Sequence, residues 1–210
     1  NIVRTLDCGE DGDVVWVAME LLSGLTLRQH LREEPLSHWT KGLSWVADIA
    51  DALTHLHARG ILHRDLKPSN IILVNGRAVL VDFGLAARVD MEDADTPAPA
   101  GTLGYMAPEV LLDGWRLDAR ADLYSLGCIL YELLSGWRAA HAKTPRDVLA
   151  LLELGPPVRV DALRPEIPRE IADLVEALLS PKVASRPGHA DRVRAVLTPL
   201  VSRPMLEATE

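Results

Sequence analysis

The stretch from residue 63 to residue 84 constrains the fold of this chain more than any other part. It contains two short apolar runs, residues 71–74 and 78–81, which are joined by Asn75-Gly76. Asn-Gly between two such runs is typical of a tight β-hairpin. The sequence therefore predicts a hairpin with one polar cluster before it, at 63–70, and another after it, at 82–84.

These polar clusters predict a site for cations and phosphate. Asp65 and Asn70 precede the first strand and Asp82 follows the second, so the hairpin is expected to bring the three side chains close together. Carboxylate and amide oxygens suit hard cations, and through them phosphate groups. Lys67, two residues after Asp65, adds a positive charge that suits a transferring phosphoryl group.

The same residues resemble the catalytic and metal-binding loops of eukaryotic-like serine/threonine protein kinases of the bacterial type. The matching segments are His-Arg-Asp-Leu-Lys-Pro-Ser-Asn at 63–70, Asp-Phe-Gly at 82–84 and Ala-Pro-Glu at 107–109. The segments come in the family's order, and the resemblance covers nearly the whole chain. It implies an α+β, protein-kinase-like fold, with a mainly helical large lobe and a remnant β-hairpin of the small lobe.

The resemblance implies a role for each polar residue and names the cofactors as ATP and Mg²⁺. Asp65 would orient the acceptor hydroxyl and take its proton, while Lys67 would offset charge on the moving phosphoryl group. Asp82 and Asn70 would each hold a Mg²⁺ ion, so Asn70 counts as both catalytic and metal-binding. Lysine at this place resembles serine/threonine kinases rather than tyrosine kinases, and the expected partner is a protein substrate with a Ser or Thr acceptor.

Residues 19–24 resemble the hinge between the two kinase lobes. The Glu20 carbonyl and the Leu22 amide would hydrogen-bond an adenine edge, and Ile72 would lie under the adenine ring. Asp82 completes the expected nucleotide-binding set. Without the kinase motifs downstream, the same residues would be interpreted as a plain strand end that leads into a helix.

Residues 85–109 resemble the activation segment of the family. Phe83, the only phenylalanine in the chain, fits a packing switch, and Gly84 is expected to adopt backbone angles that a Cβ would forbid. Arg64 could pair with a phosphate on Thr96 or Thr102. We favour Thr96 as the phosphosite, since Thr102 would hydrogen-bond toward the catalytic loop.

The resemblance also implies structural roles for His63, Asp122 and Arg186, and it makes Glu109, in the activation segment, the partner of Arg186. Asp122 would hold the backbone of the loop that begins at His63, although the residues alone also allow Asp122 to be a helix-capping or helix-dipole residue. Arg186 would pair with Glu109 across the core. Breaking such a buried pair from one side costs roughly 3–5 kcal/mol.

Periodicity predicts a helical body after the hinge. Another hairpin is expected at the start of the chain, with a turn at 9–13 before the apolar run 14–19. We divide the chain into a small-lobe hairpin and hinge (1–22), the large lobe (23–201) and a frayed C-terminal tail (202–210). Apolar residues at helical spacing predict helices over 26–31, 37–59, 118–136, from Thr144 to Pro156, from Pro168 to Leu179, and over 189–200.

Composition excludes several classes of protein. A net charge of −8 without a basic stripe argues against nucleic acid as a partner. No apolar run reaches membrane-spanning length, and the two cysteines, Cys8 and Cys128, lack metal-ligand spacing and are expected to be free thiols in a reducing compartment. These features predict a cytoplasmic domain, in a parent protein that could be membrane-anchored elsewhere. They leave the oligomeric state open.

Two alternatives to an active protein kinase stay open. The family's Gly-rich loop, strand lysine and helix glutamate have no counterpart in these residues, so we expect an N-terminally truncated kinase domain that binds Mg·ATP weakly and transfers phosphate poorly. The first alternative is a pseudokinase or scaffold that binds protein partners without catalysis. The second is a small-molecule phosphotransferase of kinase-like fold, although such enzymes do not usually carry Ala-Pro-Glu or the Gly-Thr-x-x-Tyr found at 101–105.

Overall fold

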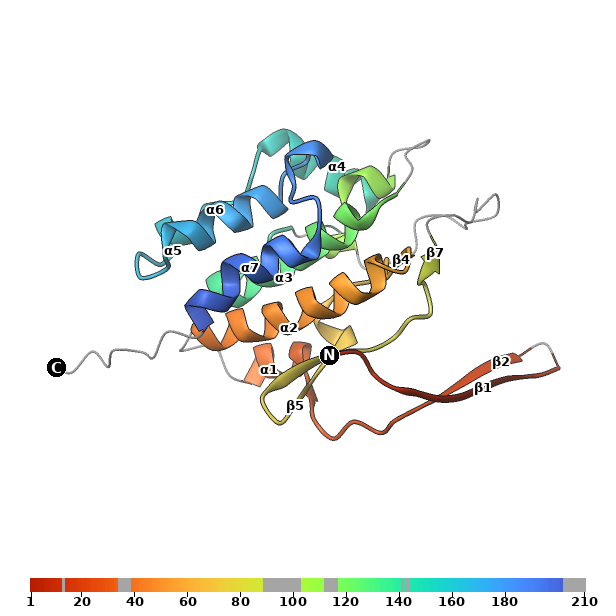
Figure 1. Ribbon diagram of the computed structural model, residues 1–210. Coiled ribbons are helices and arrows are strands. Elements are labelled where there is room, and N and C mark those ends of the chain that lie inside the picture. Colours follow the sequence, from red (N-terminus) through yellow and green to blue (C-terminus); the bar gives the residue numbers. More distant parts are fainter. Residues whose placement is uncertain are drawn as a thin grey trace.

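The computed structural model describes residues 1–12, 14–33, 39–88, 103–111, 117–140, 142 and 144–201. Helices packed side by side make up most of this part, and a long β-hairpin projects from them (Figure 1). The α+β, kinase-like architecture predicted from the sequence is confirmed. Ser37 and the predicted tail 202–210 lie outside the described residues.

Helices α2 (Trp39–His57) and α3 (Ala119–Ser135) form the centre of the body. Helix α7 (Ala190–Val201) packs along α2, and α6 (Arg169–Leu178) packs against both α3 and α7 (Figure 1). Every residue of α3 from Asp122 to Leu134 is buried. A helix that is enclosed on all sides belongs to the core of a domain, which makes α3 the element around which the others are arranged.

The ends of α3 lie where the sequence placed them. The Asp118 carboxylate accepts a hydrogen bond from the Arg120 amide at 2.8 Å and caps the N-terminus. At the other end Gly136 is left-handed, with φ of 78°, and its amide bonds to the Glu132 carbonyl at 2.9 Å. Asp118 is therefore the N-cap of α3. The alternative that Asp122 caps this helix is removed.

The predicted central hairpin is present as β5 (Ile71–Val74) and β6 (Arg77–Leu80), one residue earlier in its second strand than expected. Asn75 and Gly76 have φ of 50° and 79°, as a tight turn with two left-handed residues requires. Strand β3 (Leu25–Thr26) pairs with β5. A Cβ on Gly24 would lie 2.0 Å from the Leu73 carbonyl oxygen, so only glycine fits directly before β3.

The N-terminal hairpin is also confirmed, but its turn was predicted in the wrong place. Strand β1 (Thr5–Asp11) continues through residues 9–11, and Asp11 pairs with Val14 of β2 (Val14–Met19). Residues 1–3 are not part of this hairpin. They pair with β6 instead, since the Val3 amide bonds to the Leu80 carbonyl at 3.0 Å.

The remaining elements are short. Thr144 and Asp147 cap α4 by bonding to each other's backbone amides at 3.2 and 2.8 Å. Helix α5 was not predicted. These elements are α1 (Leu27–Glu33), β4 (Ile61–Leu62), β7 (Ala87–Arg88), α4 (Pro145–Leu154), α5 (Val160–Leu163), and 3₁₀ turns at Pro68–Asn70, Leu103–Tyr105, Pro108–Leu111 and Val183–Ser185.

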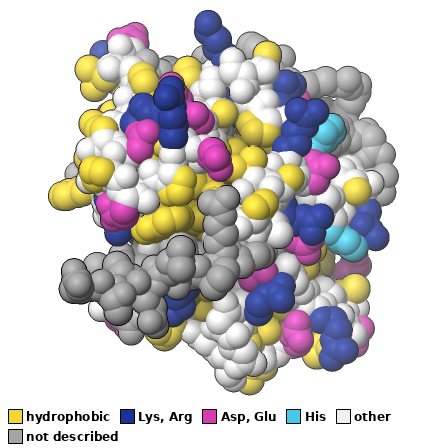
Figure 2. Space-filling view, turned by 60° about the vertical axis from the view of Figure 1, so that its left-hand side comes forward, with side chains coloured by type: hydrophobic (Ala, Val, Ile, Leu, Met, Phe, Trp, Pro, Cys, Tyr) yellow, Lys and Arg dark blue, Asp and Glu magenta, His cyan; other side chains and the backbone are white. Residues whose placement is uncertain are grey.

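In the described part of the chain, no helix has the length and apolar character needed to cross a membrane. One face of the molecule nevertheless shows a hydrophobic patch bordered by acidic and basic side chains (Figure 2). The division of the chain at residue 22 stays a prediction.

The contact between α3 and α6 gives a first testable prediction. A Cβ on Gly127 would lie 2.6 Å from the Leu178 Cβ, so the two helices meet at this glycine. Alanine is usually better than glycine in a helix by about 1 kcal/mol. Here we expect Gly127→Ala to lower the free energy of unfolding by roughly 1–3 kcal/mol, because the added methyl overpacks the contact.

Chemical denaturation measures this change. Gly188→Ala is the matched control, because a Cβ at Gly188 meets nothing within 4 Å. A Gly127→Ala variant as stable as the wild type, or more stable, would contradict the close contact.

Candidate active site

A buried carboxylate holds the loop that begins at His63. The side chain of Asp122, on α3, accepts hydrogen bonds from the backbone amides of His63 at 2.9 Å and Arg64 at 3.0 Å. His57 Nε2, from the end of α2, lies 2.8 Å from the same carboxylate. Asp122 is 1% exposed, so its carboxylate has lost its hydration water. The three protein hydrogen bonds replace that hydration.

These bonds stabilise an unfavourable backbone conformation at Arg64. Arg64 has φ of 65°, in the left-handed region that a long side chain rarely adopts. A conformation of this kind costs of order 1–3 kcal/mol and persists only when the surroundings enforce it. Because Asp122 accepts from the two consecutive amides of His63 and Arg64, it offsets this cost and turns the chain toward Asp65.

The side chain of Asp65 meets two polar neighbours from its own loop. Lys67 Nζ lies 2.5 Å from Asp65 Oδ2, and Asn70 Nδ2 donates to the same oxygen at 3.1 Å and to the Asp65 carbonyl at 2.9 Å. The 3₁₀ turn Pro68–Asn70 brings these residues together. One carboxylate is thus held in place by a cation and an amide, a pair of contacts that was not predicted, whereas the closeness of Asp65 and Asn70 was.

Asp82 lies at the same end of the central hairpin. The Val81 amide bonds to the Asn70 carbonyl at 2.9 Å, so Asp82 follows directly after the position opposite Asn70. Asp82 is left-handed, with φ of 64°, and its Oδ1 accepts from the Gly84 amide at 3.2 Å. Within the described residues its carboxylate bonds to its own loop rather than to Asp65 or Asn70.

The donor set fits magnesium in its chemistry. Among the described residues, no group of three or more His, Cys, Asp or Glu side chains could hold a metal ion. Mg²⁺ does not need such a group, because it keeps several waters and is usually bound by one or two protein oxygens plus phosphate. The exposed carboxylate of Asp82 and the amide oxygen of Asn70, whose nitrogen is directed to Asp65, are such oxygens.

Comparison with known proteins shows the family to which the chain belongs. The family described as protein kinase domain matches residues 1–197. The chain belongs to the protein kinase family. It is 32% identical over 206 residues to serine/threonine-protein kinase pkn2 of Myxococcus xanthus, covering 93% of this chain and 25% of that protein.

Two further relatives carry the same description. A probable serine/threonine-protein kinase of Clostridium acetobutylicum is 31% identical over 195 residues, covering 92% of this chain and 30% of its own length. PknB of Mycolicibacterium smegmatis, also a serine/threonine-protein kinase, is 40% identical over 143 residues, covering 64% and 23%. The chain therefore spans about a quarter of the length of the curated relatives it matches.

The segment that resembles the kinase hinge follows directly after β2. The Glu20 amide bonds to the Arg4 carbonyl at 3.0 Å, and the Glu20 side chain accepts from the Arg4 amide at 2.8 Å. These contacts tie residue 20 to the start of the chain and leave residues 20–23 outside any helix or strand. Leu22 and Ile72 are half-buried. That Glu20, Leu22 and Ile72 bind adenine stays a prediction.

The start of the activation segment is only partly as predicted. The half-buried Phe83 ring lies edge-on to the buried His63 ring, with centroids 5.2 Å apart, so the two motifs are in contact. Gly84 does not adopt a left-handed backbone, so the expectation about its angles is wrong. A Cβ there would instead lie 3.3 Å from Asp82 Oδ1. Thr96 and Thr102 lie outside the described residues.

The end of the activation segment is joined to the core by a buried ion pair. Arg186 donates to both oxygens of Glu109, at 2.6 and 2.8 Å, and to the Arg120 carbonyl at 3.0 Å. The Arg186 side chain is 0% exposed. The Tyr124 ring covers its guanidinium at 4.9 Å. This is the contact that the resemblance implied for Glu109 and Arg186.

Sequence reasoning missed some partners of the site. No role in the site was expected for His57, yet it contacts Asp122. His63 Nε2 lies 3.2 Å from the Val81 carbonyl and so links the loop to the second strand. Each contact joins residues far apart in the chain, and no local pattern signals it.

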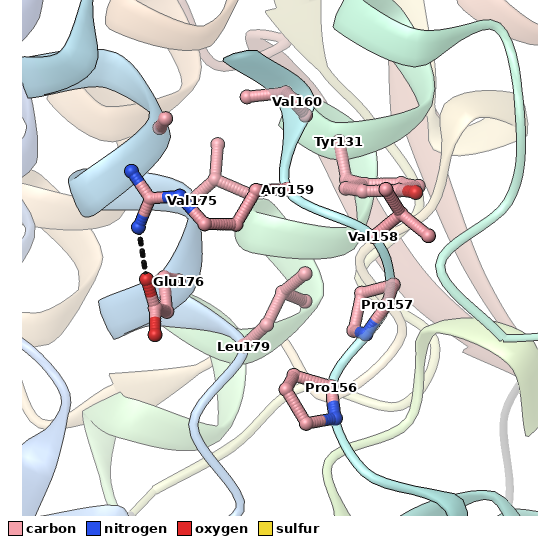
Figure 3. Close-up of a pocket in the computed structure, with 10 residues that line it drawn as sticks. Tyr131, Pro156, Pro157, Val158, Arg159, Val160, Val175, Glu176 and Leu179 are labelled. Atoms are coloured by element: carbon pink, nitrogen blue, oxygen red, sulfur yellow. Dashed lines mark hydrogen bonds and ion pairs between the residues drawn. The ribbon is translucent and has the colours of Figure 1, made fainter. Parts of the chain in front are cut away.

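A pocket lies away from this loop, between α3, α5 and α6 (Figure 3). Its walls are mainly apolar, and an ion pair between Arg159 and Glu176 closes one side. It shares no residue with the kinase motifs. The lining residues are Tyr131, Pro156, Pro157, Val158, Arg159, Val160, Ala172, Val175, Glu176 and Leu179.

The Glu109–Arg186 pair gives a second prediction. Replacing one partner leaves the other charge buried and unpaired, so Glu109→Leu and Arg186→Met should each destabilise the protein by roughly 3–5 kcal/mol. The double variant removes both charges and should lose clearly less than the sum of the two. Free energies of unfolding for the four proteins measure this. Additive losses would show that the two side chains do not depend on each other.

Proposed function

We propose that this chain supplies the catalytic loop of an ATP-dependent protein kinase that phosphorylates serine or threonine hydroxyls of proteins, and that the chain by itself transfers phosphate poorly. The observation that carries the proposal is the Asp65 carboxylate, which Lys67 and Asn70 hold in place in a loop anchored by Asp122. Phosphoryl transfer depends on positioning and charge neutralisation more than on covalent chemistry. A carboxylate fixed in this manner suits that task.

The roles proposed for the loop follow from its contacts. Among the described residues, Lys67 and Asn70 both donate to Asp65 Oδ2, so Oδ1 would accept the proton of an incoming hydroxyl. Lys67, tied to Asp65, would bring a positive charge next to the phosphoryl group as it moves to that hydroxyl. We propose these as the catalytic residues.

The nucleotide and its cations would be held by the neighbouring oxygens. Asn70 and Asp82 would hold Mg²⁺, which supplies charge neutralisation on the nucleotide phosphates when bound. Glu20 and Leu22 would offer backbone groups to the adenine edge, and Ile72 would cover the ring. The support for this proposal is that residues 20–23 belong to no helix or strand, and that Leu22 and Ile72 are half-buried.

Three regulatory and contextual proposals remain. We propose that a phosphate on Thr96 pairs with Arg64, and that Thr102 serves structure at the substrate site. We also propose a cytoplasmic location, which agrees with free thiols at Cys8 and Cys128. The partners would be protein substrates.

The base role of Asp65 gives a third prediction. In the full-length gene product, Asp65→Asn should cut kcat for phosphate transfer to a protein substrate by about 10²–10⁴-fold, the usual worth of a positioned base. Asp51→Asn, at an exposed position of α2, is the control with the same chemical change. Turnover that survives Asp65→Asn would remove the base role. A wild-type protein that transfers no phosphate while it binds partner proteins would favour the scaffold function.

The metal role of Asp82 gives a fourth prediction. Asp82→Asn should weaken binding of Mg·ADP, measured by calorimetry, by about 10–100-fold, because an ionised ligand is lost. With EDTA in place of Mg²⁺, wild type and variant should bind ADP with similar affinity. Equal affinities in the presence of Mg²⁺ would show that Asp82 does not hold the metal.

A further inference from the structure

The pocket between α3, α5 and α6 has two walls that differ in origin. One wall is the segment that joins α4 to α5. Gly155, directly after α4, is left-handed, with φ of 94°, and Pro156 and Pro157 then fix the direction of the backbone. Proline has no backbone N–H, so this wall presents mainly apolar surface. Val158 follows, and it is 60% exposed.

The other wall is one face of α6 and the residue that ends it (Figure 3). Relative to Ala172, the lining residues Val175, Glu176 and Leu179 follow after three, four and seven positions, so they project from the same side. The buried Tyr131 of α3 also lines the pocket. The space between the walls is about 350 Å³, counting its open mouth. Such a space suits an apolar side chain that enters from outside.

Arg159, at the N-cap of α5, joins the two walls. Its guanidinium donates to both oxygens of Asp161, at 3.1 and 2.9 Å, to Asp173 at 2.7 Å, and to Glu176. The bonds from Arg159 lower the pKa of Asp161, and the bonds to Asp161 and Asp173 raise the pKa of Arg159, so these groups are charged at neutral pH. Arg159 therefore holds the walls together, and its donors are already used.

The rim of the pocket keeps a surplus of negative charge. Arg169 lies 3.9 Å from Asp173, so two guanidinium groups face three carboxylates. Asp173 and Glu176 are each 55% exposed, which leaves them open to a further cation. Between residues 153 and 176 the sequence has six acidic and three basic side chains. The pocket is therefore complementary to a ligand that is both apolar and basic.

We propose that this pocket docks a segment of the protein substrate in which an aliphatic side chain is flanked by Lys or Arg. The aliphatic side chain would enter between Val158 and Val175, and the basic residue would pair with Glu176 or Asp173. The inference rests on the proposed kinase function and adds a second contact with the substrate. Because the pocket shares no residue with the kinase motifs, a docked segment leaves the loop of Asp65 free for the acceptor hydroxyl.

Binding is tested on the full-length gene product with short fluorescent peptides, measured by anisotropy. The panel places one Leu and two Lys at every combination of positions among Ser and Gly. The best binder should lose about 10-fold in affinity when Ser replaces Leu, because the partial burial of an aliphatic side chain is lost. It should lose about 2–5-fold when Glu replaces one Lys, as for a partly exposed charge pair.

Variants assign this binding to the pocket. Val158→Asp should remove the preference for Leu, because a carboxylate would stand in the apolar wall. Val15→Asp is the matched control, since Val15 is 72% exposed on β2, in the hairpin that projects on the side away from α5 and α6 (Figure 1). It should bind the peptides as the wild type does. Glu176→Lys should reverse the charge preference from Lys to Glu, and Glu176→Gln should weaken it without reversal.

The substrate role is tested by joining the best binder to an acceptor peptide through flexible linkers of increasing length. With a linker that spans the two sites, the joined peptide should have a KM about 10-fold lower than the acceptor alone, with kcat unchanged, because docking raises the effective concentration of the acceptor. Val158→Asp should remove this advantage and leave the turnover of the acceptor alone unchanged.

The outcomes separate the two proposals. If the peptides bind at the pocket but no acceptor is phosphorylated, the proposed kinase function fails, and the binding site alone is supported. If acceptors are phosphorylated but no peptide binding depends on Val158, the function stands and the docking site is overturned. Self-association that Val158→Asp removes would assign the pocket to a second copy instead. Peptide binding that needs deletion of residues 202–210 would assign it to the chain's own tail.

Discussion

The carboxylate of Asp122 is the contact on which the rest of the site depends. It is buried inside α3, and it accepts the amides of His63 and Arg64 together with a hydrogen bond from His57. A buried charge is tolerated only when its hydrogen bonds are made, so the helix and the loop constrain each other. The position of Asp65 follows from this, because the chain must turn sharply at Arg64 to satisfy Asp122.

The hairpin of β5 and β6 also constrains the site, because it sets the position of Asp82 relative to Asn70. Its turn at Asn75-Gly76 fixes the register of β5 and β6, and the register places Val81 opposite Asn70. The two polar clusters of the motif thus reach the same edge through backbone hydrogen bonds, and the contact between the rings of His63 and Phe83 adds to them. The site is therefore carried by rigid elements, as positioning of a phosphoryl group requires.

Local signals predicted most of the fold, and non-local contacts account for what was missed. Asn75-Gly76 predicted the hairpin, and Gly136 predicted the end of α3, because each needs only neighbouring residues. The pairing of residues 1–3 with Leu80, and the contact of His57 with Asp122, join distant parts of the chain. The site motifs were found from the sequence through their order, whereas the Arg159–Glu176 pair has no local signature.

Mn²⁺ bound with a nucleotide analogue in place of Mg²⁺ tests the central claim most directly, because the paramagnetic ion broadens NMR signals of nearby nuclei. We predict strong broadening of the Asn70 side-chain amide and of the backbone amides on either side of Asp82. Signals from the buried face of α7, such as the amide of Leu197, should stay sharp. If the nucleotide binds but the Asn70 and Asp82 signals stay sharp, the loop does not hold the metal, and the account of this site is wrong.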